Sequence, residues 1–138
     1  MNAIVELLKL KIDLSVKHTM IKETEVVEVL GNELPDMNAV LEKTEDVNNI
    51  YKAMQCFASF TKSLVNKGDF REVKHCFNVA ENLLKHGNST VINAIGNVYV
   101  YSLSSILDLT NPLSLKVKSL LTDSLRKEYR RQVGASGL

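Results

Sequence analysis

Apolar side chains recur at three- and four-residue steps along most of this chain, which is the spacing of one face of an α-helix. Three such stretches follow one another, at residues 44–67, 69–86 and 89–109, and glycines stand at the turns between them. Helices joined by turns this short pack antiparallel against their neighbours. The pattern therefore predicts an all-α protein with a single antiparallel bundle of about five to six helices.

The turns carry residues that begin and end helices. Thr44 is a candidate N-cap for the helix over 44–67, because its hydroxyl can accept a hydrogen bond from a free amide. Gly68 can take the left-handed conformation that ends this helix. Asp69, with Glu72 three residues later, has the spacing of a capping box for the next helix.

The stretch at 89–109 is apolar nearly all round, so it is predicted to be the central helix, with Tyr99 and Leu103 in the core. Gly96 within it costs about 1 kcal/mol in helix propensity relative to alanine. The close approach of a neighbouring backbone could offset this loss. We therefore expect the other helices to surround this one.

Shorter helices are predicted on both sides of this core. Residues 24–34 carry valines and leucines at helical spacing, and Asp36 can cap a short following helix over 37–42. Asn111 and Pro112 supply a cap and a first-turn proline. They begin a single last helix with the apolar residues Leu113, Val117, Leu120, Leu121, Leu125 and Tyr129.

The first 19 residues follow a different pattern. Residues 8–17 alternate apolar and polar side chains with period two, as a half-buried strand would. This segment either pairs with a second copy in a homodimer, lies along another protein, or forms a helix with Ile4, Leu7, Leu8 and Ile12 on one face. We expect a segment of undefined structure at 1–19, a bundle domain at 20–133 and a flexible tail at 134–138.

The net charge of +1 predicts no general attraction to nucleic acid or to anionic membranes, and no stretch is long and uniformly apolar enough for a membrane span. The charges are nevertheless unevenly placed. Basic residues dominate 116–131. Eight acids, here called the acidic stretch, lie close together in the first third of the chain: Glu23, Glu25, Glu28, Glu33, Asp36, Glu42, Glu45 and Asp46. Either both regions are solvated helix faces, or the acidic stretch docks a basic partner.

Two pairs of asparagines also stand at helical spacing. Asn78 with Asn82, and Asn93 with Asn97, are four residues apart and form polar stripes. These stripes either line a recognition groove or form hydrogen bonds with helix ends and solvent.

The sequence offers few groups for catalysis. Cys56 and Cys76 lie beside apolar residues in predicted helices, which is typical of buried free thiols in a reducing cytosol. His75 adjoins Cys76, and neighbours on a helix diverge by about 100°, so joint ligation of one metal ion is awkward. A Cys–His nucleophile pair would also need an orienting group and an oxyanion site, which no pattern supplies. We predict no catalytic residue, no metal site and no cofactor.

Several core and turn segments resemble those of an uncharacterised family of small all-helical bacterial proteins, over about residues 20–125. The matching segments are VVEVL at 26–30, ELP at 33–35, CFASF at 56–60, FNVAE at 77–81 and VINAI at 91–95. Members of this kind resemble, in size and make-up, the immunity proteins that neutralise secreted bacterial toxins. The resemblance implies a similar role and supplies no active-site residue.

These observations lead to one functional expectation and two alternatives. We expect a non-enzymatic, cytoplasmic protein-binding domain, with the acidic stretch as its partner surface and a basic toxin domain as a fitting partner. The alternatives are a self-associating scaffold or adaptor, and a regulator that binds a small molecule between helices.

Overall fold

The computed structural model describes residues 20–135, and within that range it confirms an all-α fold. The predictions for residues 1–19, including the strand at 8–17, and for the last three residues lie outside the described chain. The elements are, in order, η1 (Glu23–Glu25), α2 (Val26–Glu33), η2 (Pro35–Met37), α3 (Asn38–Lys43), α4 (Ile50–Lys67), α5 (Phe70–His86), α6 (Ser89–Ala94), η3 (Ile95–Val100), α7 (Tyr101–Leu107), α8 (Pro112–Ser119) and α9 (Asp123–Ala135).

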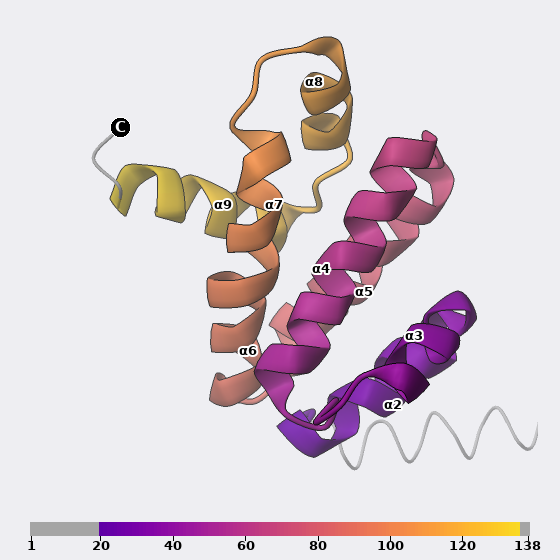
Figure 1. The fold of residues 1–138 in the computed structure, drawn as a ribbon. Coiled ribbons are helices and arrows are strands. Elements are labelled where there is room, and N and C mark those ends of the chain that lie inside the picture. The colour runs from indigo at the N-terminus through magenta and orange to yellow at the C-terminus, as the bar shows by residue number, and fades with distance from the viewer. Residues whose placement is uncertain (1–19, 136–138) are drawn as a thin grey trace, which may run out of the picture.

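Elements α6, η3 and α7 form one continuous helix (Figure 1). The prediction that the other helices surround it is only partly right: α4, α5, α8 and α9 contact it, but Asn93, Asn97 and Tyr101 lie on a face that is exposed. The hairpin of α4 and α5 packs along one side of it, and α9 crosses both α5 and η3. The short helices α2 and α3 pack against one end of α4, and α8 lies at the opposite end of the molecule. Tyr99 and Leu103 are fully buried at the centre, which confirms their predicted place in the core.

The middle of the core contains a small hydrogen-bonded group. The rings of Phe57 and Tyr99 stack with their centroids 4.2 Å apart. The Thr61 hydroxyl donates to the Phe57 carbonyl at 2.9 Å and lies 2.9 Å from the Tyr99 hydroxyl. Because the single proton of Thr61 is used on the carbonyl, Tyr99 donates to Thr61. Both buried hydroxyls are thereby satisfied inside an apolar core.

The central helix widens into a π-helical turn at η3, where Gly96 lies against α9. A Cβ atom at this position would stand 2.7 Å from Glu128 Oε1. The Gln132 side-chain amide donates to the Gly96 carbonyl at 2.6 Å. The predicted close approach at this glycine is therefore real, but side chains of α9 make it instead of a neighbouring backbone.

The same continuous helix, Ser89–Leu107, is long and apolar enough to cross a membrane by length and composition. The prediction that no span is present rested on uninterrupted apolar runs, and this helix is interrupted by polar residues such as Asn93 and Asn97. In the structure its apolar side chains Val91, Ile95, Tyr99, Leu103 and Leu107 are buried in the middle of the bundle.

The predicted start of the first long helix is wrong by six residues. The Thr44 hydroxyl donates to the Val40 carbonyl at 2.7 Å, so Thr44 ends α3 and does not begin α4. Asp46 then has a φ of 55°, which is incompatible with a continuing helix. Asn49 provides the cap, because its side chain accepts hydrogen bonds from the backbone amides of Tyr51 and Lys52.

Other predicted helix ends are correct. Gly68 has a φ of 74° and ends α4, and the Asp69 carboxylate accepts from the Glu72 amide to begin α5. Asn111 caps α8 by accepting from the Ser114 amide at 2.8 Å. The prediction for Asp36 is wrong, because Asp36 lies inside the 3-10 turn η2 and no side chain caps α3.

The single last helix predicted from the sequence is in fact two helices. The chain leaves α8 at Leu120 and begins again as α9 at Asp123, so the two helices point in different directions (Figure 1). The residues that hold this break come from α5 and α9, and they line an open cleft.

Candidate functional site

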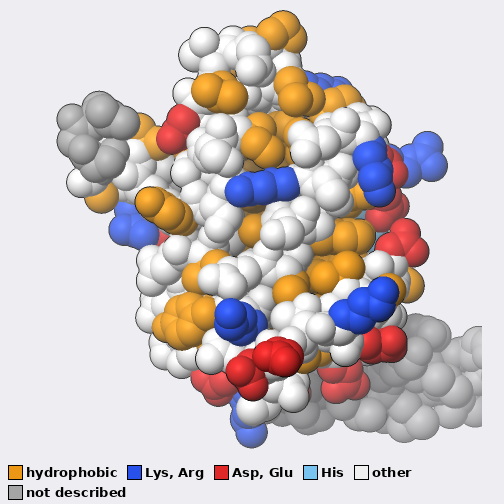
Figure 2. All heavy atoms as spheres, viewed as in Figure 1, with side chains coloured by type: hydrophobic (Ala, Val, Ile, Leu, Met, Phe, Trp, Pro, Cys, Tyr) orange, Lys and Arg blue, Asp and Glu red, His pale blue; other side chains and the backbone are white. Residues whose placement is uncertain are grey.

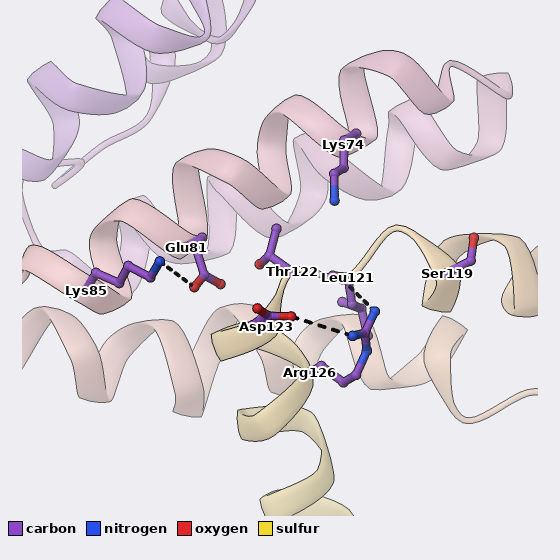
Figure 3. Close-up of a pocket in the computed structure, with 8 residues that line it drawn as sticks. All are labelled: Lys74, Glu81, Lys85, Ser119, Leu121, Thr122, Asp123 and Arg126. Carbon is purple, nitrogen blue, oxygen red and sulfur yellow. Dashed lines mark hydrogen bonds and ion pairs between the residues drawn. The ribbon is translucent and has the colours of Figure 1, made fainter.

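The described part of the chain has an open cleft beside the connection between α8 and α9 (Figure 3). Its volume is about 400 Å³, and it is lined mainly by charged and polar side chains: Lys74, Glu81, Lys85, Ser119, Leu121, Thr122, Asp123 and Arg126. The chemistry of this cleft depends on whether these charges are free or already bound to one another.

Glu81 is the central residue of the cleft. Its side chain is only 12% exposed, and its carboxylate accepts hydrogen bonds from the backbone amides of Ser124 at 3.0 Å and Leu125 at 3.3 Å. Burial alone would raise the pKa of Glu81, but the hydrogen bonds from Ser124 and the Leu125 backbone amide outweigh it and hold that pKa below its usual value. Glu81 on α5 therefore caps α9 from outside that helix.

The basic side chains of the cleft hold the same connection. Lys74 Nζ donates to the Leu120 carbonyl at 3.0 Å, and Arg126 donates to the Leu121 carbonyl at 2.8 Å. Figure 3 shows the two ion pairs of the cleft, Lys85 with Glu81 at 3.6 Å and Arg126 with Asp123 at 3.8 Å. The charged groups are thus engaged in joining α5 to α9. These hydrogen bonds and ion pairs stabilise the position of α9 against α5.

The two cysteines lie in different environments. Cys76 is completely buried, and burial raises its pKa to about 12. Cys56 is only partly buried, with its sulfur 3.4 Å from the Thr44 hydroxyl. The His75 side chain is 40% exposed, and its Nδ1 atom lies 3.5 Å from the Glu72 carboxylate. This arrangement matches the predicted partly exposed imidazole beside a packed thiol.

We expect the two thiols to react at very different rates with iodoacetamide. The thiolate is the reactive form, and at neutral pH Cys76 is both protonated and enclosed. In native protein at pH 7.5, peptide mass spectrometry should find Cys56 modified and Cys76 protected, with both modified in urea. Modification of Cys76 at the rate of Cys56 in folded protein would contradict this assignment.

The acidic stretch forms a largely exposed surface on η1, α2, η2, α3 and the turn before α4. Seven of its eight acids are exposed, and Glu23 is partly buried. Figure 2 shows acidic side chains gathered along the lower edge of the molecule, where these elements lie. Within residues 20–135, no ion pair joins any of the eight to a basic side chain.

Acids elsewhere in the described chain all have internal partners. Asp69 caps α5, and Asp108 accepts a hydrogen bond from the Tyr129 hydroxyl. The other four lie within 4 Å of a basic side chain: Glu72, Glu81, Asp123 and Glu128. Four of the six acids outside the acidic stretch thus pair with a base, and within residues 20–135 none of the eight inside it does.

One predicted asparagine stripe also lines a groove. Asn78 and Asn82 on α5 share a groove of about 330 Å³ with His75, Val79 and Glu33. Glu33 belongs to the acidic stretch, so α5 and α2 combine a carboxylate with two amides. The sequence indicates the stripe but not its link to Glu33, which depends on how α2 packs. Asn93 and Asn97 are exposed on α6 and η3.

Among residues 20–135, no group of three His, Cys, Asp or Glu side chains is placed to hold a metal ion. In comparisons with known proteins, the family model described as Domain of unknown function (DUF7674) matches residues 27–135. No curated protein and no solved structure matches the chain.

Proposed function

The chain belongs to the family described as Domain of unknown function (DUF7674), and we propose that it is a non-enzymatic domain that binds a basic protein through the acidic stretch. The observation that carries this proposal is the contrast between the two groups of acids. Of the six other described acids, four pair with a basic side chain, whereas within residues 20–135 none of the eight in the acidic stretch does. Such a surface is suited to a partner that supplies the missing positive charge.

The groove beside Glu33 gives this surface a point of directional contact. A lysine or arginine from a partner can place its charge on the Glu33 carboxylate while the amide oxygens of Asn78 and Asn82 accept its remaining hydrogen bonds. Arginine is enriched among the residues that dominate binding energy in protein interfaces. In this proposal the wider acidic stretch speeds encounter, and the groove holds one basic side chain.

A toxin-neutralising immunity protein is the particular form of this proposal that the resemblance to bacterial families supports. An immunity protein covers the active surface of its toxin, which needs a rigid binding face and no catalytic group. In this form the protein acts in a reducing bacterial cytoplasm, where free thiols such as Cys56 and Cys76 persist. Co-expression of this protein with the toxin would test this form directly, because an immunity protein should keep the cells alive.

Reversing charge in the acidic stretch should slow binding of the partner without unfolding the domain. Four exposed acids are suitable because their carboxylates make no hydrogen bond or ion pair within the described chain: Glu28, Glu33, Glu42 and Glu45. We expect lysine at these four positions to lower the association rate about tenfold or more at low salt. The difference should shrink as added salt shortens the Debye length.

Stopped-flow or surface-plasmon measurements at several salt concentrations would provide these rates, with circular dichroism to check that the variant is folded. An unchanged association rate in the folded variant would place the partner surface elsewhere.

Self-association is a second candidate function, favoured by apolar side chains exposed at the α7–α8 end. Leu109 is 50% exposed, Leu113 40% and Leu115 54%. Because exposed leucines are often covered by another chain, this end could join two copies. Light scattering of wild-type protein and of the Leu113→Glu variant decides the matter: a dimer that the variant converts to monomer favours self-association, and a monomer in both cases excludes it.

A further inference from the structure

A second, smaller pocket lies where the end of α8 meets α9. Its volume is about 140 Å³, and it is lined by three basic side chains, one leucine and one tyrosine: Lys118, Arg126, Arg130, Leu121 and Tyr129. No acidic side chain lines it. Arg126 and Leu121 also line the larger cleft, so the pocket adjoins the region drawn in Figure 3.

The positive charge of this pocket is largely uncompensated. Lys118 donates to the Leu109 carbonyl at 3.2 Å and Arg126 donates to the Leu121 carbonyl, but a neutral carbonyl removes no charge and uses only part of each donor set. The Asp123 carboxylate that lies 3.8 Å from Arg126 is 91% exposed, so solvent screens this pair strongly. Arg130 is exposed and has no partner within residues 20–135.

The remaining walls of the pocket are apolar. Leu121 is only 5% exposed, and Tyr129 is held by its hydroxyl, which donates to Asp108 at 2.6 Å. Burial and the Asp108 carboxylate raise the pKa of Tyr129 to about 12, so the phenol stays neutral and does not repel an anion. The ring is therefore a fixed apolar surface beside three cations.

We propose that this pocket binds the phosphate group of a small phosphate monoester. Three basic side chains match a group that carries nearly two negative charges and three acceptor oxygens better than they match a carboxylate. A volume of about 140 Å³ has room for one phosphate group. The organic part of the ligand would lie along Leu121 and the Tyr129 ring, at the open side.

This site does not involve the acidic stretch, and it holds whether or not a basic protein binds there. The probe for its test is phenyl phosphate, titrated into the full chain in phosphate-free buffer at constant ionic strength. Amide shifts in two-dimensional NMR should saturate, with the largest changes near Leu121 and Arg130. Phenyl phosphate should bind more tightly than inorganic phosphate, because only the ester contacts the apolar wall.

Two variants with the same loss of charge provide the decisive comparison. Arg130→Gln removes a cation of the pocket, whereas Lys127→Gln removes an exposed cation of the same helix that does not line it. Arg130→Gln should weaken phenyl phosphate about tenfold, and Lys127→Gln should leave it within about twofold.

Three results would overturn the proposal: no saturable shift, equal weakening by the two variants, or equal affinity for phenyl phosphate and inorganic phosphate. If Arg130→Gln fails to fold, Lys118→Gln provides the same comparison from α8.

Discussion

Leu103→Ala is expected to lower the free energy of unfolding by about 2 to 5 kcal/mol. Leu103 is 1% exposed and lies on α7, in the continuous α6–η3–α7 helix, which contacts α4, α5, α8 and α9. Truncation removes buried apolar surface and leaves a cavity that the surrounding helices can only partly close. Urea unfolding followed by circular dichroism at 222 nm gives this difference directly.

Leu115→Ala is the matched control for this substitution. Leu115 is 54% exposed on α8, and the same chemical change there should alter stability by about 0.5 kcal/mol or less. A similar loss of stability in both variants would show that burial does not separate these positions. The central place of the α6–η3–α7 helix would then be wrong.

Glu81→Ala is expected to destabilise the fold by about 1.5 to 3 kcal/mol, the range for hydrogen bonds to a charged group. The Glu81 carboxylate caps the start of α9, and without it the amides of Ser124 and Leu125 lose their acceptor in a largely enclosed site. Glu72→Ala on the same helix is the control, because Glu72 is 40% exposed and pairs only with a partly exposed histidine. Thermal unfolding of both variants at pH 7 makes the comparison.

The effect of Glu81 should depend on pH with a defined sign. Because the pKa of Glu81 is lowered by folding, its contribution to stability is complete above the unfolded-state pKa of about 4.3. That contribution is lost as the pH falls through the still lower folded-state pKa. The stability difference between wild type and Glu81→Ala should therefore be constant from pH 7 to about 5 and shrink below pH 4. A difference that grows under acid conditions would rule out the capping role.

The helical pattern was sufficient to predict the fold class and the core because both follow from local spacing. Gly68, Asp69 and Asn111 act through neighbours within about one helical turn, so sequence alone identifies their roles. Thr44 was misassigned because its hydroxyl can serve either the preceding carbonyl or a following amide, and the geometry of the turn at Asp46 decides between them.

The break between α8 and α9 could not be predicted in this way. Its apolar residues continue at helical spacing, and the residues that hold the break are far away in the sequence. Glu81 binds the amides of residues more than 40 positions later, and Lys74 reaches Leu120 across a similar separation. Tertiary hydrogen bonds overrode the local pattern at this point.

The same limit applied to the candidate binding surface. The acidic stretch was visible from the sequence alone, but its lack of ion pairs within residues 20–135 was not. Nor does any sequence pattern place Glu33 beside Asn78 and Asn82, since α2 and α5 meet only in the folded molecule. The charge density of the surface was thus predictable, and its groove was not.

A three-way capture experiment tests the binding proposal most directly. The baits are the wild-type chain, a variant with Glu28, Glu33, Glu42 and Glu45 changed to glutamine, and a control with four exposed neutral residues changed to lysine: Gln55, Thr90, Asn93 and Asn97. Each variant has a net charge four units more positive than wild type, but only the glutamine variant alters the acidic stretch. Quantitative mass spectrometry would identify proteins retained from cells of the source organism on each bait at low salt.

The proposed function predicts a protein with a basic surface that is retained by wild type and by the lysine control and is lost from the glutamine variant. Retention of the same proteins on all three baits, or on none, would contradict it.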